Sequence, residues 1–236
     1  MHIETLVLPT RHLEAQHRFY TRTLGLTPEH ETPSSVTFRT GTSRLTWQQD
    51  DLAGGFCHLA WDIPSSQVEA AESWLGQRLK LLAAPDGQTR ITRFPPGGNW
   101  NTTNLYFQDA ADNILEFVAR HDLGGEAPLP FGAHSLLRLS EFGVVVPDVG
   151  AAVHRLGENF GLFPFNGSSD TFTALGSHEG MLIMVREGRG WFPTDRPSVP
   201  AEFQITWRVG AKLHLLDHLG LKTSPQSARP EQAATP

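Results

Sequence analysis

The sequence has almost no cysteine and no long apolar run. Cys57 is the only cysteine among 236 residues, so an internal disulfide is excluded and the fold must be held by packing. The longest apolar runs, such as residues 142–146 and 181–185, fall far short of the ~20 residues that span a bilayer. The first residues lack the basic and apolar regions of a secretory signal. These absences favour a cytoplasmic protein without a membrane helix.

Basic residues are also scarce. The chain has 19 Lys and Arg against 25 Asp and Glu, with a formal net charge of −6 and no cluster of cations. Nucleic acids and anionic membranes bind through such clusters, so neither is an expected partner. The sequence contains no GxSxG, P-loop or GxGxxG motif, and it therefore gives no support to an acyl hydrolase or a nucleotide-binding fold.

What the chain does contain is a repeated order of strands and helices. The first unit is predicted as a strand at 3–8, a helix at 13–24 and strands at 36–39 and 44–48. The second is predicted as a strand at 56–63, a helix from Ser65 or Ser66 to about 79, and strands near 90–94, 104–108 and 114–119. These two units fill residues 1–122.

The same order returns in the second half. The third unit is predicted as a strand from Leu139, a helix capped by Asp148, and strands at 171–175 and 181–186. The fourth has a strand at 202–209 and a predicted helix at 211–219, where the order breaks off. We expect a second domain at 138–220, a linker at 123–137, and a disordered tail at 221–236 that is rich in Pro, Ser, Ala and Gln.

Three segments resemble the vicinal oxygen chelate superfamily, which includes glyoxalase I, extradiol dioxygenases, fosfomycin-resistance enzymes and bleomycin-binding proteins. Residues 13–26 resemble its first helix, His58-Leu-Ala-Trp its second-module opening strand, and residues 105–117 its closing strand pair. The usual turn Asp-Pro-x-Gly-Asn is replaced by Asp109-Ala110-Ala111-Asp112-Asn113, in which Asp112 can adopt a left-handed conformation. The resemblance implies an α+β fold of repeated βαβββ modules that form cup-shaped half-barrel sheets, with the last module truncated.

The resemblance also implies a divalent ion inside a cup, held by the first and last strands of paired modules. Transferred singly, these positions are His58 and Glu116 in the second module and Glu141 in the third. The corresponding residues of the first and fourth modules, Thr5 and Gln204, are poor ligands. If the second module pairs with the third, His58, Glu116 and Glu141 converge on one cup. If modules pair only within each half, the first cup has Thr5, His58 and Glu116, which is an incomplete set. The sequence favours the crossed pairing and leaves both open.

One imidazole and two carboxylates suit Mn²⁺, Fe²⁺, Ni²⁺ or Zn²⁺. Ile183 stands where glyoxalase-type sites have a fourth ligand, so a position would be open for substrate. The ion would polarise vicinal oxygens of a small molecule, and Glu116 or Glu141 could act as the catalytic base. Glu141 in place of a histidine counts against the two-His, one-carboxylate chemistry of extradiol dioxygenases.

Each candidate residue also has a structural interpretation. His58 could be a core histidine, and Glu141 could lie in solvent at the start of a strand. Glu116 could be neutralised by an arginine, the candidates being Arg39, Arg93 and Arg120. Cys57 is interpreted as a buried, inert thiol.

Other motifs have both a functional and a structural interpretation. His214 and His218 are four residues apart but lack a third ligand. The loop from Arg186 to Pro193 could clamp an anion or be a solvated turn. Five aromatic residues could line a pocket or belong to the core: Trp47, Trp100, Tyr106, Trp191 and Phe192.

The leading hypothesis is a metal-dependent lyase, isomerase or ring-cleaving oxygenase of glyoxalase or dioxygenase type with a small oxygen-rich substrate. The alternative is a metal-free protein that sequesters a small molecule, as bleomycin-binding relatives do. A third interpretation is a structural dimerisation module. A homodimer is plausible under each hypothesis, because the unfinished fourth module leaves strand edges that a second chain could cover.

Overall fold

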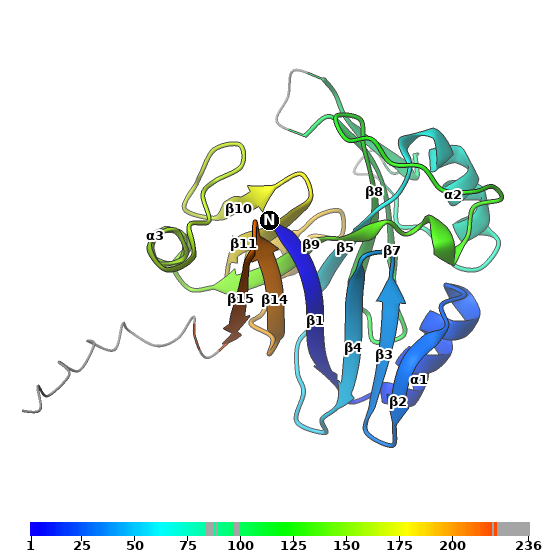
Figure 1. The fold of residues 1–236 in the computed structure, drawn as a ribbon, viewed down its shortest axis with the longest axis horizontal. Coiled ribbons are helices and arrows are strands. Elements are labelled where there is room, and N and C mark those ends of the chain that lie inside the picture. The colour runs from blue at the N-terminus through cyan, green and yellow to red at the C-terminus, as the bar shows by residue number, and fades with distance from the viewer. Residues whose placement is uncertain (84–86, 88, 97–99, 219, 221–236) are drawn as a thin grey trace, which may run out of the picture.

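A computed structural model describes the chain except residues 84–86, 88, 97–99, 219 and 221–236 (Figure 1). The predicted tail at 221–236 therefore lies outside the described residues. The strands are β1 (His2–Thr10), β2 (Pro28–Thr32), β3 (Ser35–Thr40), β4 (Ser43–Gln49), β5 (His58–Asp62), β6 (Ile91–Phe94), β7 (Thr102–Gln108), β8 (Ile114–Arg120), β9 (Arg138–Val146), β10 (Phe172–Ser177), β11 (Gly180–Arg186), β12 (Gly190–Trp191), β13 (Arg196–Pro197), β14 (Gln204–Val209) and β15 (Lys212–Asp217). The helices are α1 (Leu13–Arg18), α2 (Val68–Gly76) and α3 (Val149–Phe160), with a π-helical turn at Phe19–Thr23 and 3₁₀ turns at Ser65–Gln67 and Ala133–Ser135.

Two mixed sheets carry the fold, and both combine distant parts of the sequence. Sheet A has the strand order β15-β14-β1-β4-β3-β2, and sheet B, which curls into a half-barrel, has the order β10-β11-β9-β5-β8-β7-β6. The β5 strand of the second module pairs antiparallel with β9 of the third. The predicted crossed pairing is therefore confirmed, and the α+β fold of repeated modules is as expected.

The first module differs from its prediction by one additional strand. Residues 28–32, Pro-Glu-His-Glu-Thr, form β2 at the edge of sheet A and are mostly exposed. Because this strand buries almost no apolar residue, its sequence lacks the alternation that marks a half-buried strand. The helix predicted at 13–24 corresponds to α1 and the π-helical turn, and it ends before Gly25, whose φ is +68°.

The helix predicted at 211–219 is wrong. Residues 212–217 form β15, which pairs with β14 through a turn at Gly210, where φ is +56°. Trp207 of β14 lies opposite His214, and their rings stack with centroids 5.5 Å apart. The fourth module is thus a β-hairpin, and His214 and His218 do not share a helical face.

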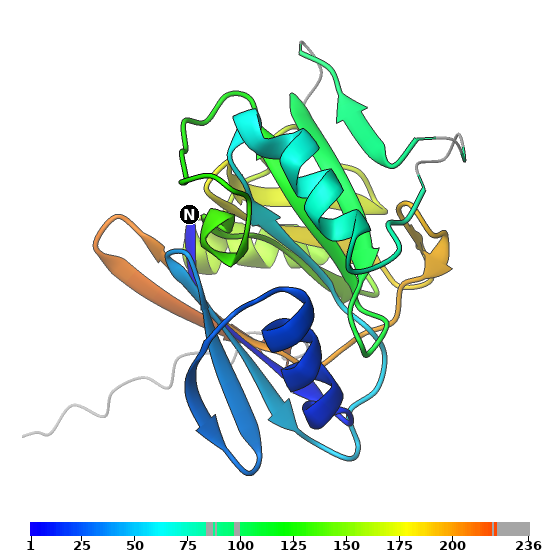
Figure 2. The same ribbon diagram turned by 90° about the vertical axis from the view of Figure 1, so that its right-hand side faces the viewer.

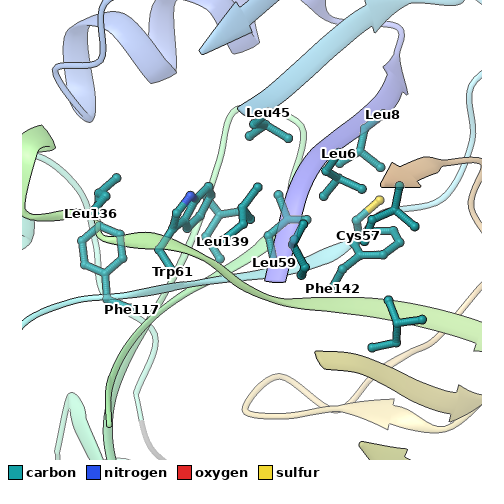
Figure 3. Packing of buried hydrophobic residues seen from close by; sticks show 14 of the residues in the cluster. Leu6, Leu8, Leu45, Cys57, Leu59, Trp61, Phe117, Leu136, Leu139 and Phe142 are labelled. Carbon is teal, nitrogen blue, oxygen red and sulfur yellow. The ribbon is translucent and has the colours of Figure 1, made fainter. Parts of the chain in front are cut away.

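The core lies between the two sheets. One buried cluster joins the inner faces of both sheets, and Figure 3 shows Leu6 and Leu45 of sheet A packed toward Leu59 and Phe142 of sheet B. Helix α1 packs on β3 and β4, α2 on β7, and α3 on β10 and β11 (Figure 2). Among the described residues, each helix is too short or too polar to cross a bilayer.

Residues 123–137 connect the halves and are tied to both sheets. Phe131 and Leu136 are buried in this segment. The Leu137 carbonyl accepts a hydrogen bond from Thr42 N at 3.0 Å, next to Gly41. A Cβ at Gly41 would lie 2.0 Å from the same carbonyl oxygen, and its φ is +60°. Only glycine permits this approach of the β3–β4 turn to the connection.

The turn before β8 keeps its shape without the usual proline and glycine. Asp112 adopts the left-handed conformation, with φ at +60°, as predicted. Asp109 Oδ1 accepts hydrogen bonds from Ala111 N and Asn113 N at 2.9 and 3.0 Å. Asn113 Oδ1 in turn accepts from Cys57 N at 2.7 Å. These side chains therefore fix the start of β8 beside the start of β5.

Candidate metal centre

Strand alternation brings His58 and Glu116 to the same face of sheet B. On β5, His58 faces the inside of the cup, while Leu59 and Trp61 enter the core. On β8, Glu116 lies between two core residues and also lines the cup. Because β5 and β8 are adjacent parallel strands, side chains on the same face of the two strands are neighbours.

Glu141 reaches this face through a β-bulge. Ala60 pairs with Glu141 and Trp61 with Leu139, so Ser140 is an extra residue on β9. In a regular strand, Leu139 and Glu141 would share a face. The bulge lets Leu139 join the core while Glu141 lines the cup, and such re-aiming of a side chain is a recurrent use of bulges.

The three side chains converge as predicted. His58 Nε2 lies 3.3 Å from Glu116 Oε2 and 4.0 Å from Glu141 Oε2. One ligand atom of each residue lies within 4.8 Å of the others. Metal bonds of about 2.0–2.2 Å are compatible with such separations after small adjustments. The group could hold a divalent ion, and it is the only such cluster within the described ranges.

Each carboxylate uses one oxygen for a positioning contact and leaves the other toward His58. Asn104 Nδ2 donates to Glu116 Oε1, and Arg120 Nη2 donates to Glu141 Oε1. The Oε2 atoms are the ones nearest His58 Nε2. Hydrogen bonds of this kind orient the ligands of a metal and fix the direction of their lone pairs.

Arg120 is itself held in place. Its Nε donates to Asp62 Oδ1 at 3.0 Å, and Arg138 Nε lies 3.3 Å from the other oxygen of Asp62. Arg120 is 3% exposed, so this network extends from Glu141 to the rim of the sheet. Glu141, Arg120, Asp62 and Arg138 therefore form a network of alternating charges beside the cup.

The structural interpretations of the ligands can now be compared with the contacts. Arg39 pairs with Glu29 on sheet A, and Arg120 pairs with Glu141 rather than with Glu116. Arg93 forms no ion pair with Glu116 in the part of the chain that the structure describes. Glu141 is only 7% exposed, so it does not lie in solvent.

Burial changes the proton affinity of this cluster. Burial alone would lower the pKa of His58, but the hydrogen bond and charge of Glu116, with the charge of Glu141, raise it overall. Burial raises the pKa of Glu141, although the charge of Arg120 opposes the change. A cation that bound here would compete with protons for these groups, because a metal binds the deprotonated form of its ligands.

A cavity of about 290 Å³ opens over the cluster. Its floor carries His58, Glu116 and Glu141. Ile183, which stands where glyoxalase-type sites are expected to have a fourth ligand, also lines the cavity. Six aromatic side chains form most of the wall: Phe94, Trp100, Tyr106, Phe172, Trp191 and Phe192. Four of the five aromatic residues considered from the sequence thus line the cavity, whereas Trp47 is buried in the core.

The remaining candidates lie elsewhere. Thr5 hydrogen-bonds Thr206 on sheet A, and Gln204 lies on the same sheet. His218 lies 3.5 Å from Glu202. Burial and the charge of Asp109 raise the pKa of Cys57 to about 12, which agrees with an inert thiol.

Sequence reasoning missed three residues of the site. Asn104 was not singled out, Arg120 was considered only as a partner of Glu116, and Arg189 was considered only within a loop. Arg189 lines the cavity, whereas Arg186 of the same loop is exposed. The local signal for Arg189 was the pair of cations and the pair of glycines in residues 186–193, which suggest only that the loop as a whole could clamp an anion.

No protein-family model and no curated protein matches the sequence. Solved structures do share the fold. A putative dioxygenase from Bacillus subtilis subsp. subtilis str. 168 is 16% identical, with a TM-score of 0.57 over 85% of this chain and 67% of that one. A glyoxalase I mutant from Zea mays is 14% identical, with a TM-score of 0.55 over 86% of this chain and 73% of that one. The chain therefore has the vicinal oxygen chelate fold.

Proposed function

We propose that this protein is a metal-dependent enzyme of glyoxalase or dioxygenase type that acts on a small oxygen-rich substrate in the cup of sheet B. The observation that supports the proposal most directly is the convergence of His58, Glu116 and Glu141 beneath a cavity. A buried group of two carboxylates is costly unless cations compensate it. Arg120 supplies one positive charge that Glu141 shares with Asp62, and a divalent ion would balance the remaining negative charge of Glu116, Glu141 and Asp62.

His58, Glu116 and Glu141 would hold Mn²⁺, Fe²⁺, Ni²⁺ or Zn²⁺, because one nitrogen and two oxygen donors suit these ions. When bound, the ion would supply Lewis-acid polarisation of substrate oxygens. We favour lyase or isomerase chemistry over ring cleavage, because Glu141 replaces a histidine of the two-His, one-carboxylate set.

The protein's own part in the reaction would be proton transfer. Glu116 and Glu141 each have one oxygen fixed by a hydrogen bond and both line the cavity. Either carboxylate, once its second oxygen leaves the metal, could accept a proton from a bound substrate and return it. The aromatic walls would exclude water from this exchange.

Metal binding tests the proposal. Wild-type protein purified without chelator should contain up to one ion per chain and, after chelator treatment, should bind Mn²⁺ in calorimetry. His58→Ala and Glu116→Gln should lose binding by a factor of ten or more. Gln204→Ala on sheet A is the matched control and should retain it. Equal metal uptake by all four proteins would refute the proposal.

A metal-free binding protein is the second candidate, and the aromatic wall favours it. That function predicts ligand binding which is indifferent to chelator, together with no metal uptake. For either function we propose a cytoplasmic location, in line with a free buried cysteine. We also propose a homodimer, because the edge strand β15 exposes Leu213 and Leu215, and light scattering of the purified protein would test it.

A further inference from the structure

Arg189 is a half-buried cation in the cavity wall that pairs with none of the described carboxylates. It lies between β11 and β12, and its guanidinium carbon is 5.0 Å from the centre of the Phe172 ring. Its side chain donates one hydrogen bond, from Nη1 to the Gly190 carbonyl at 3.1 Å. Within the described ranges no carboxylate pairs with it. Most of its hydrogen-bonding capacity is therefore free, since a guanidinium has five N–H donors.

Six other arginines of the described chain do pair with carboxylates. Those that pair with carboxylates are Arg18, Arg39, Arg44, Arg120, Arg138 and Arg208. Arg189 is instead partly withdrawn from water, and this burial lowers its pKa. A cation in such a place is stabilised by an anion, and an arginine can bind a carboxylate through two parallel hydrogen bonds.

The backbone holds Arg189 in position. Ser198 N donates to the Arg189 carbonyl at 2.8 Å, and Gly188 N donates to the Ser198 carbonyl at 2.9 Å. The residue therefore sits on a hydrogen-bonded hairpin rather than on a free loop. The backbone that carries Arg189 is therefore already ordered before a ligand binds, which reduces the entropy cost of binding.

The rest of the cavity defines the shape of the ligand. Its wall is aromatic, its floor carries the His58, Glu116 and Glu141 cluster, and Arg189 is the only arginine or lysine in its lining. A volume of about 290 Å³ is at the lower end for small-molecule sites. It suits a single ring with one or two small substituents.

We infer that the cavity binds a monocyclic aromatic acid, with its ring between the aromatic walls and its carboxylate on Arg189. A catalytic role for the bound acid rests on the proposed function, in which the end of the ligand away from Arg189 faces the proposed metal ligands. Binding through Arg189 itself requires no metal. Arg189 is thus proposed to determine specificity for anionic substrates.

Calorimetry with two probes of the same shape tests the inference. The full-length protein, loaded with Mn²⁺ and also metal-free, is titrated with 4-hydroxybenzoate and with its neutral analogue 4-hydroxybenzamide. Wild type should prefer the acid. Arg189→Gln should weaken acid binding about 10- to 100-fold, as expected for a charge-assisted bond, and should abolish the preference. Arg189→Lys should bind the acid with an affinity between those of wild type and Arg189→Gln.

Arg186→Gln is the matched control, because it removes an exposed positive charge from the same loop, and it should bind like wild type. Circular dichroism of each variant checks that it is folded. Equal acid affinity in wild type and Arg189→Gln, equal binding of hexanoate and 4-hydroxybenzoate, or no binding of the acid to wild type at millimolar concentration would each overturn the inference.

The outcomes separate this inference from the proposed function. Acid binding that depends on Arg189 in a protein that takes up no metal would support the inference and refute the enzyme. Metal uptake that depends on His58, together with acid binding indifferent to Arg189, would do the reverse.

Discussion

At the scale of single residues, Gly143 sets how closely the aromatic wall approaches His58. A Cβ at Gly143 would lie 2.6 Å from Trp191 Cη2 and 3.1 Å from His58 Cβ. The rings of His58 and Trp191 have centroids 5.2 Å apart. Gly143→Ala should therefore displace Trp191, lower the free energy of unfolding by about 1–3 kcal/mol and weaken Mn²⁺ binding. Urea unfolding and calorimetry measure the two effects.

The control for this change is Gly150→Ala. Gly150 lies in α3, and its Cβ would meet only Asp148 Oδ1 at 3.5 Å. Because alanine favours a helix over glycine, this variant should gain up to about 1 kcal/mol. A Gly143→Ala protein as stable as wild type, with unchanged Mn²⁺ affinity, would show that Trp191 does not support the site.

Asp109 offers a test of burial through pH. It accepts hydrogen bonds from Gln16, Asn113 and the turn backbone, so Asp109→Asn should cost about 1–3 kcal/mol by placing an amide donor among donors. Burial raises the pKa of Asp109. The folded state therefore binds this proton more tightly than the unfolded state, where the pKa is about 3.9.

The sign of the pH effect follows. The contribution of Asp109 to stability is largest below about pH 4 and falls as the pH rises through its folded pKa. Asparagine does not titrate, so the stability gap between wild type and Asp109→Asn should narrow with rising pH. Urea unfolding at several pH values gives this gap directly. A gap that widens would mean that the hydrogen-bond donors around Asp109 outweigh burial and lower its pKa.

The sequence was informative about single residues only where a strand pattern and a family resemblance coincided. His58, Glu116 and Glu141 could be predicted because their places are counted along strands. The bulge at Ser140 could not, because strict alternation would put Leu139 and Glu141 on one face. Asn104 and Arg120 contact residues on other strands. The sequence of one strand does not show which residue of another strand its polar side chains will bind.

At the scale of elements, β15 shows how a short amphipathic run can be misread. Its leucines and its one histidine suit a helix period as well as a strand period, since six residues are too few to separate the two. Tertiary pairing decides: Ile205 lies opposite Leu216, and Trp207 stacks on His214. The edge strand β2 was missed because it buries almost no side chain and so has no apolar pattern of either period.

Substitutions in β15 check the hairpin. Leu216 is 4% exposed, whereas its neighbour Leu215 is 54% exposed. Leu216→Ala should lower the free energy of unfolding by about 2–3 kcal/mol, while Leu215→Ala should change it by less than about 0.5 kcal/mol. The comparison uses the same residue type and the same truncation. Similar losses for the two variants in urea unfolding would contradict the hairpin.

At the scale of the whole molecule, the sequence favoured the crossed pairing of modules without excluding pairing within each half, and it did not predict the cavity. Crossed pairing is the one arrangement that unites the three proposed ligands. The need for a complete set of ligands therefore favoured the pairing of the second module with the third. The cavity, in contrast, combines β7, β11 and the β12 region. Its shape depends on contacts between segments far apart in sequence, which strand patterns do not encode.

Metal binding should shift the unfolding of the entire protein as one transition. His58 and Glu116 lie in the first half of the chain and Glu141 in the second, and one core cluster joins both sheets. At 100 times its dissociation constant, Mn²⁺ should add about 2.7 kcal/mol to the free energy of unfolding. Circular dichroism and tryptophan fluorescence should report the same midpoint with and without Mn²⁺, and His58→Ala should remove the shift. Two transitions, of which Mn²⁺ moves only one, would mean that the halves unfold separately, because a ligand stabilises only the unit whose folding creates its site.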